Sequence, residues 1–162
     1  MALSCSTPGC RFDVAPACPV KRIGPVEPTH DPEAEAFVSA VIANEPVVLF
    51  ALEWCEFSWS VRKLFGRLDI AYKSVDLDSV ALQEGQLGNK VRAVLAERTG
   101  ASTIPQVYVG GRHVGGCTEL FDGIREGSVQ RLLEDAGVAF DGDAQIDPYE
   151  LLPGWVQPRK FA

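Results

Sequence analysis

Cys55 lies where a short apolar run meets a helical pattern, and this placement favours a reactive thiol. Residues 47–50 are continuously apolar, as in a buried strand. After Cys55, apolar side chains recur at helical spacing: Phe57, Val61, Leu64, Phe65 and Leu68. Free N–H groups and the dipole at a helix start favour an anion, and the thiolate is the reactive form of cysteine. Because polar Glu53, Glu56 and Ser58 surround it, we interpret Cys55 as a solvent-accessible nucleophile rather than a buried structural cysteine.

Two other segments have residue types suited to binding a ligand beside this thiol. Thr103-Ile104-Pro105 directly precedes an apolar strand pattern, and Gly115-Gly116-Cys117-Thr118-Glu119 directly precedes a helical one. Glycine allows a backbone to approach a ligand closely, and N–H groups at a helix start form an anion site. The same residues also suit structural roles, with the two glycines as a turn and Thr118 as a helix cap.

The elements that must position these segments follow from the hydrophobic pattern and its interruptions. Asp31-Pro32 is a favourable helix start, and Asn44 with Pro46 ends that helix. A buried strand is predicted at 47–51, and the helix that begins at Cys55 follows it. This order places Cys55 at the carboxyl end of a strand.

The second half of the chain has one more strand, a long helical pattern and a hairpin. Residues 72–77 alternate like a strand. A helix is predicted over 79–99, although Gly85 and Gly88 disfavour its first half. Two strands at 105–109 and 112–115 are joined by Gly110 and Gly111, a pair that meets the positive backbone angles of a tight turn. Thr118 and Ser128 are then predicted to cap two further helices.

This order predicts a small α/β domain over 31–137, with the first two strands parallel and the hairpin antiparallel. Ligands of such sheets bind beyond the carboxyl ends of the strands, which is where Cys55 falls. Residues 1–30 are rich in cysteine and proline and are predicted to be a loosely structured N-terminal extension. Residues 138–162 are predicted to be an extended tail that lies along the domain.

The composition of the 162 residues, 46% hydrophobic and 23% charged, is that of a soluble globular protein. We expect no membrane segment and no secretory signal, and the net charge of -7 argues against nucleic acid as a partner. Five cysteines without a secretory signal favour reduced thiols and a cytoplasmic location. Cys5, Cys10 and Cys18 form no Cys-x-x-Cys pair, and the only histidines are His30 and His113, so no metal site is expected among these residues.

Taken together, the motifs resemble those of a glutaredoxin, a family with the thioredoxin fold, over about 47–136. The resemblance rests on the Cys55-x-x-Ser58 helix start, on Thr103-Ile104-Pro105 before a strand, and on the segment from Gly115 to Leu120 that opens a helix. It implies a four-stranded mixed sheet flanked by helices, with irregular N- and C-terminal extensions. It also implies a glutathione-dependent thiol–disulfide oxidoreductase.

The resemblance further implies how glutathione is held. The Ile104–Pro105 bond is expected to be cis, so that glutathione pairs with the backbone of Ile104 as an added strand. Gly116 and the N–H groups around Cys117 and Thr118 would bind the γ-glutamyl carboxylate. The Thr118 hydroxyl and Glu119 would reach the same end of the ligand, with Glu119 on its amino group. The site residues implied by the resemblance are Cys55, Phe57, Thr103, Ile104, Pro105, Gly116, Cys117, Thr118 and Glu119.

The expected reaction removes glutathione from glutathionylated proteins or small disulfides. The Cys55 thiolate attacks the glutathione sulfur, and a second glutathione then resolves the mixed disulfide. Ser58 stands where a dithiol enzyme has its resolving cysteine, so the site is predicted to be monothiol. Cys117 is either a small core residue or a second thiol that pairs with Cys55 under oxidation. Trp59 is predicted to be a packing or rim residue.

Two positions depart from the family pattern. Leu52 stands where a lysine is usual, and Ser102 where many members have arginine. With acidic neighbours in place of these cations, we expect Cys55 to ionise less readily and glutathione to bind more weakly than in an ordinary dithiol member. Arg62, Lys63 and Arg98 are candidates for a substitute cation.

Two other functions fit the same motifs. Two chains can share an iron–sulfur cluster (2Fe-2S) through Cys55 of each and two glutathiones, which requires a homodimer. Against this carrier function, the chain has Glu56 in place of the glycine of Cys-Gly-Phe-Ser and lacks a longer loop with a lysine before the cysteine. The third alternative is a non-catalytic glutaredoxin-like module that docks onto another protein through its tails.

Overall fold

The computed structural model of the 162-residue chain describes residues 31–157. The predicted N-terminal extension, with Cys5, Cys10, Cys18 and His30, lies outside the described residues. Across 31–157 no helix combines the length and the apolar character needed to cross a bilayer.

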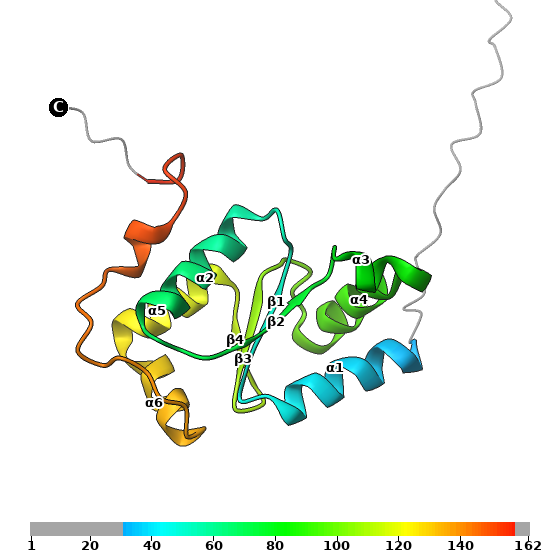
Figure 1. Ribbon diagram of the computed structural model, residues 1–162, viewed down its shortest axis with the longest axis horizontal. Helices are drawn as coiled ribbons and strands as arrows, with labels where there is room; N and C mark the ends of the chain where they lie inside the picture. The colour runs from blue at the N-terminus through cyan, green and yellow to red at the C-terminus, as the bar shows by residue number, and fades with distance from the viewer. Residues whose placement is uncertain (1–30, 158–162) are drawn as a thin grey trace, which may run out of the picture.

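A four-stranded mixed sheet forms the centre of the molecule, as expected (Figure 1). Its strands are β1 (Val47–Ala51), β2 (Lys73–Asp76), β3 (Gln106–Val109) and β4 (Arg112–Gly115), in the spatial order β2-β1-β3-β4. The β1–β2 pair is parallel, whereas β1–β3 and β3–β4 are antiparallel. Gly110 (φ 56°) and Gly111 (φ 78°) supply the positive backbone angles of the predicted hairpin turn.

Helices cover both faces of this sheet, which explains why β1 is apolar along its whole length. On one face, α1 (Pro32–Asn44) and α4 (Leu87–Thr99) pack against Val48 and Phe50. On the other face, α2 (Glu56–Arg67), α5 (Cys117–Glu126) and α6 (Ser128–Asp135) pack against Val47, Leu49 and Ala51. Both sets of β1 side chains are fully buried.

The first helix begins as predicted. Asp31 Oδ1 accepts hydrogen bonds from the N–H groups of Glu33 (3.0 Å) and Ala34 (3.1 Å), and Pro32 is the first helical residue. Lys90 Nζ lies 2.8 Å from Asp31 Oδ2 and so joins α4 to the start of α1.

The helix predicted over 79–99 is interrupted, and this corrects the sequence prediction. A short helix, α3 (Val80–Gln83), is followed by a 3-10 turn, η1 (Glu84–Gln86), and then by α4. The break lies at Gly85 (φ 61°) and Gln86 (φ 56°), whose left-handed backbone cannot continue a helix. Gly88 serves a different purpose, because a Cβ atom there would lie 1.9 Å from the Leu77 carbonyl oxygen.

Two predicted helix caps are also wrong. Gly116, not Thr118, is the N-cap of α5, and Thr118 is the second residue of that helix. Gly127 (φ 78°), not Ser128, is the N-cap of α6, where it also ends α5. A left-handed backbone at this tight connection favours glycine over serine. Ser128 instead donates a hydrogen bond from Oγ to the Gly123 carbonyl oxygen at 3.3 Å.

Residues 138–157, which we call the strap, lie along α2 and α5 and include a 3-10 turn, η2 (Pro148–Leu151) (Figure 1). Asp141 N–H donates to the Leu68 carbonyl oxygen at 2.7 Å, and Ser60 Oγ donates to that of Leu151 at 2.8 Å. The apolar strap residues that pack on the core are Val138, Phe140, Ala144, Ile146, Tyr149, Leu151 and Leu152. The strap is therefore joined to the domain along much of its length.

Candidate functional site

Cys55 is the N-cap residue of α2, with extended backbone angles (φ -93°, ψ 119°) and a half-exposed side chain. Its N–H donates to the Leu52 carbonyl oxygen at 3.3 Å, and its own carbonyl oxygen accepts from the N–H of Trp59 at 3.0 Å. The thiol thus lies at the positive end of the helix dipole, as the sequence predicts.

The loop that presents this thiol is held by side chains of α2 and of the turn that follows β2. Both carboxylate oxygens of Asp78 accept the N–H of Glu53, at 2.8 and 3.0 Å. Buried Ser58 accepts the N–H of Leu52 at Oγ, at 3.3 Å. Trp59 Nε1 donates to the Glu53 carbonyl oxygen at 2.6 Å. Ser58 therefore has a structural role in fixing the loop before Cys55.

The sheet register brings the Thr103-Ile104-Pro105 loop to the same end of the molecule as Cys55. Phe50 near the end of β1 pairs with Gln106 at the start of β3, directly after this loop. The Ile104–Pro105 bond is cis, as expected. Buried Gln106 donates from Nε2 to the carbonyl oxygens of Ala101 (2.7 Å) and Thr103 (3.2 Å) and so holds the loop. Thr103 is exposed, Ile104 half-buried and Pro105 buried.

The start of α5 lies beside the same loop. Val107 of β3 pairs with Gly115 of β4, and a Cβ atom on Gly116 would lie 3.3 Å from the Pro105 carbonyl oxygen. Glu119 Oε2 accepts the N–H of Gly116 at 3.0 Å, so one of its carboxylate oxygens is engaged in capping this helix. Gly116 is half-buried, while Thr118 and Glu119 are exposed.

Cys117 is part of the hydrophobic core rather than of the exposed site surface. Only 6% of the residue is exposed, and burial raises the pKa of its thiol to about 12, with smaller contributions from the Cys55 and Glu119 charges. The strand register and the close approach of Gly116 to Pro105 bring the three segments to the same end of the sheet. The core role expected for Cys117 fits its burial.

Alkylation should therefore separate these two thiols. We expect iodoacetamide at pH 7.5 to label Cys55 and to label Cys117 at least about a hundredfold more slowly, because a thiol reacts as its thiolate and Cys117 is both buried and protonated. Mass spectrometry of tryptic peptides at timed intervals measures both rates. Labelling in urea is the control, since unfolding should make Cys117 reactive. Equal rates in the folded protein would contradict its placement in the core.

Two of the three substitute cations proposed from sequence are already engaged in ion pairs within the domain. Arg62 pairs with Asp76, and Arg98 pairs with Glu35. Lys63 lines a groove between α2 and the strap.

Arg92 on α4 is a cation beside the Ser102–Pro105 loop that the sequence analysis did not single out. Its Nε donates to the Ser102 carbonyl oxygen at 3.3 Å, directly before Thr103. It also lines a cleft of about 350 Å³ with Leu52 and Asp78, which adjoin the Cys55 loop. The buried stripe of α4, formed by Val91, Val94 and Leu95, was the available signal, because it fixes which way Arg92 faces once α4 is placed.

Aromatic side chains border the Cys55 end of α2. Phe57 is half-buried and packs on the core. Trp59 is 41% exposed, which fits the predicted rim position, and its ring centroid lies 6.4 Å from that of Trp54. Trp155 of the strap contacts Phe57 edge to face, with ring centroids 5.9 Å apart.

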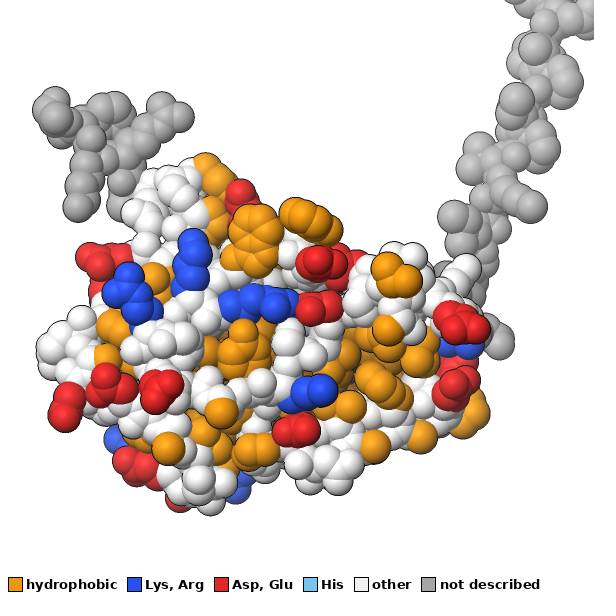
Figure 2. All heavy atoms as spheres, in the orientation of Figure 1, with side chains coloured by type: hydrophobic (Ala, Val, Ile, Leu, Met, Phe, Trp, Pro, Cys, Tyr) orange, Lys and Arg blue, Asp and Glu red, His pale blue; other side chains and the backbone are white. Residues whose placement is uncertain are grey.

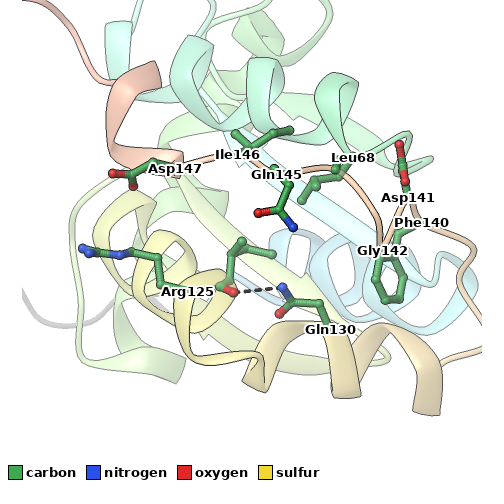
Figure 3. A pocket seen from close by; sticks show the side chains of 11 residues that line it. Leu68, Arg125, Gln130, Phe140, Asp141, Gly142, Gln145, Ile146 and Asp147 are labelled. Atoms are coloured by element: carbon green, nitrogen blue, oxygen red, sulfur yellow. Dashed lines mark hydrogen bonds between the residues drawn. The ribbon is translucent and has the colours of Figure 1, made fainter.

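A separate cavity lies between α5, α6 and the strap (Figure 3). Its volume is about 490 Å³, and its polar lining side chains are those of Arg125, Gln130, Asp141, Gln145 and Asp147. The Gln130 amide donates to the Ile124 carbonyl oxygen at 2.8 Å, drawn as the dashed line in Figure 3. No cysteine lines this cavity, so the candidate site remains the Cys55 surface.

Known glutaredoxins are similar to this chain over the segment that contains Cys55. The glutaredoxin family model matches residues 47–114. The chain is 37% identical over 97 residues to a glutaredoxin of Solanum lycopersicum, covering 60% of this chain and 85% of that protein. It is 34% identical over 104 residues to monothiol glutaredoxin-S10 of Oryza sativa subsp. japonica, covering 64% of this chain and 61% of that protein. The chain therefore spans less than two thirds of that relative.

Solved structures match over a similar length. A buckwheat glutaredoxin–glutathione complex is 30% identical with a TM-score of 0.61, covering 67% of this chain and 94% of the other. A wheat glutaredoxin is 36% identical with a TM-score of 0.60, covering 66% and 98% respectively. The strap begins after residue 137 and so lies beyond the segment that the family model matches.

Proposed function

Because the chain belongs to the glutaredoxin family, we propose that it is a glutathione-dependent thiol–disulfide oxidoreductase with Cys55 as its nucleophile. One observation carries the proposal. The half-exposed thiol at the start of α2, the Thr103-Ile104-Pro105 loop and the start of α5 meet at one end of the sheet. A thiol nucleophile, an exposed loop backbone and an anion-binding helix start are the groups that exchange with a glutathione mixed disulfide requires.

The reaction proceeds by two exchanges. The Cys55 thiolate attacks the glutathione sulfur of a mixed disulfide; the original S–S bond breaks, a Cys55–glutathione disulfide forms, and the released substrate thiolate takes up a proton. A second glutathione thiolate then attacks the glutathione sulfur bound to Cys55. This step yields oxidised glutathione and restores the Cys55 thiolate, so the electrons come from glutathione.

Two positions near Cys55 could hold its disulfide partner in a dithiol cycle, and the side chain at each supports a monothiol cycle instead. Ser58 is buried and bonded to the Leu52 N–H, and a hydroxyl forms no disulfide. Cys117 stays protonated at neutral pH because burial raises its pKa to about 12. The resolving thiol is therefore expected to come from glutathione.

The proposed glutathione orientation follows from the two ends of the site. The γ-glutamyl carboxylate would bind the free N–H groups at the start of α5, at Cys117 and Thr118. Glu119 keeps one carboxylate oxygen for the ligand amino group while the other accepts the Gly116 N–H. Phe57 would flank the sulfur. The buckwheat relative is a glutathione complex, which supports the same ligand here.

We further propose that Arg92 binds the glycine carboxylate of glutathione. It would take the role of the lysine that is usual in the family at the position of Leu52. We expect Arg92→Gln to raise the KM for glutathione about five- to tenfold, because a charge-assisted hydrogen bond would be lost. Steady-state kinetics at varied glutathione concentration measures this change.

Arg98→Gln is the matched control, since it removes an arginine from the same helix that is already paired with Glu35. Its KM for glutathione should stay within about twofold of the native value. An unchanged KM in Arg92→Gln, or an equal change in both variants, would contradict the assignment of Arg92.

One experiment tests the oxidoreductase proposal against its alternatives. The protein is purified anaerobically with glutathione, its visible absorption is recorded, and turnover of a glutathione mixed disulfide is then assayed. Turnover without colour supports the enzyme. Colour with little turnover supports a 2Fe-2S carrier. Residues 31–157 contain no group of three metal-ligating side chains, so each chain would supply only Cys55 and the carrier would need a homodimer. The absence of both colour and turnover supports a non-catalytic docking module. For the enzyme we propose a reducing compartment such as the cytoplasm.

A further inference from the structure

The end of the strap lies against the two residues that follow Cys55. Trp155 Nε1 donates a hydrogen bond to Glu56 Oε2, and its ring meets that of Phe57 at an interplanar angle of 83°. Gln157 donates from Nε2 to the carbonyl oxygens of Glu150 and Leu152, both at 3.0 Å, which closes the strap around Trp155.

Trp155 extends an exposed aromatic surface around the Cys55 end of α2. Trp54 is 77% exposed and Trp155 71%, and we call these two side chains with Trp59 the aromatic rim. A groove of about 230 Å³ runs between α2 and the strap, lined by Glu56, Trp59, Ser60, Lys63, Leu151 and Pro153. Figure 2 shows large hydrophobic side chains standing beside acidic ones over this end of α2.

Two carboxylates, Glu53 and Glu56, flank Trp54 and Cys55 beside the aromatic rim. Residues 52–61 contain Glu53 and Glu56 and no lysine or arginine. In the strap, Glu150 of η2 is the acidic residue on the segment that contacts α2, whereas Asp141 and Asp147 line the cavity of Figure 3. Lys63 lines the same groove as Glu56 and Trp59, about one helical turn beyond Trp59 and two beyond Cys55.

We propose that the aromatic rim, with Glu53 and Glu56, docks basic polypeptide segments that flank a glutathionylated cysteine. This inference rests on the proposed function and names its substrate class. Indole faces attract the cations of lysine and arginine, and exposed carboxylates beside them add a favourable charge interaction. The strap thereby determines substrate preference, while Cys55 and the glutathione-binding residues perform the exchange.

Matched glutathionylated peptides test this docking surface in the full-length protein. Three peptides of equal length have lysine, serine or glutamate on both sides of the modified cysteine, and a small glutathione mixed disulfide gives the reference turnover. We expect kcat/KM for the lysine peptide to exceed that for the glutamate peptide about tenfold at low salt. Equal values for the three peptides, with the small disulfide turned over, would overturn the docking inference alone.

Variants then locate the preference on the surface. Trp155→Ala and Glu56→Gln should each reduce the tenfold ratio to about threefold, whereas Trp155→Phe, which keeps an aromatic face, should retain more of it. Glu134→Gln on α6 is the charge-matched control and should leave the ratio unchanged. A ratio unaffected by Trp155→Ala, or lowered equally by Glu134→Gln, would contradict docking at the aromatic rim.

Binding measured without turnover separates this inference from the proposed function. Tryptophan fluorescence is titrated with S-methylated versions of the three peptides, which cannot exchange. One outcome is that no disulfide is turned over, the lysine peptide binds about tenfold more tightly than the glutamate peptide, and Trp155→Ala loses this difference. In that case the docking surface stands and the oxidoreductase proposal fails. If the lysine peptide binds only to a variant that ends at Gln157, the chain's own 158–162 segment competes for the surface, and a substrate as its occupant is excluded.

Discussion

Replacing Cys55 with serine is expected to lower turnover of a glutathione mixed disulfide by at least about a thousandfold. A hydroxyl remains protonated at neutral pH and forms no disulfide, so neither exchange step can take place. The fold should persist, because Cys55 occupies the N-cap of α2 without a side-chain capping bond and serine is a favoured residue there. We expect the free energy of unfolding to stay the same or to rise by up to about 1 kcal/mol. Coupled turnover assays and urea denaturation measure the two effects.

Cys117→Ala is the matched control for this loss. Alanine replaces a small buried side chain without adding a buried hydroxyl, so turnover should remain within about threefold while the unfolding free energy falls by about 1 kcal/mol. A loss of turnover comparable to that of Cys55→Ser would show that Cys117 takes part in the reaction and that the cycle is not monothiol.

The elements nearest the site were predictable because local sequence determines them. The uninterrupted apolar run of β1 requires a strand buried on both faces, and Gly110-Gly111 matches a tight hairpin turn. The position of Cys55 at the start of a helix was predictable from the sequence boundary between β1 and α2. The end of the sheet at which Thr103-Ile104-Pro105 and Gly116 meet Cys55 then follows from strand order alone.

The wrong predictions share a local cause. Thr118 and Ser128 are good N-cap residues by type, but in each case a nearby upstream glycine takes that position. Sequence pattern ranks residue types and does not reveal that the chain must turn with a left-handed residue at Gly127. The interruption of 79–99 lies at Gly85, one of the two glycines that disfavour this helix by type, but residue type alone did not show that Gly85 breaks the helix while Gly88 lies within it.

Arg92 and Trp155 were not predicted because long-range contacts determine their positions, and the apolar stripe of α4 orients Arg92 only once α4 has been placed on the sheet. Arg92 is 37 residues from Cys55 in the sequence, and the packing of α4 on the sheet brings it to the site. Trp155 reaches Phe57 because hydrogen bonds join the strap to two helices. Ser60 of α2 donates to the Leu151 carbonyl oxygen, and the Tyr149 hydroxyl donates to Asp122 of α5 at 2.6 Å. No periodicity within 138–157 signals these partners.

Gly88→Ala is expected to lower the free energy of unfolding by about 2–3 kcal/mol, a large loss for the addition of a single methyl group. A Cβ atom at this position would lie 1.9 Å from the Leu77 carbonyl oxygen, which is backbone and cannot rotate away. The first turn of α4 must therefore shift away from the end of β2. Urea denaturation measures the loss.

Gly66→Ala is the control that isolates this steric effect from helix propensity. Gly66 lies exposed in α2 with nothing within 4 Å of its added Cβ, so alanine should raise the unfolding free energy by about 0.5–1 kcal/mol. The two variants are thus expected to change stability in opposite directions, although both replace a helical glycine. Because Arg92 lies one helical turn beyond Gly88, the shift of α4 in Gly88→Ala should also raise the KM for glutathione, whereas Gly66→Ala should not. Equal stability of the two variants would mean that α4 does not approach Leu77 closely, and the placement of Arg92 beside Ser102 would lose its support.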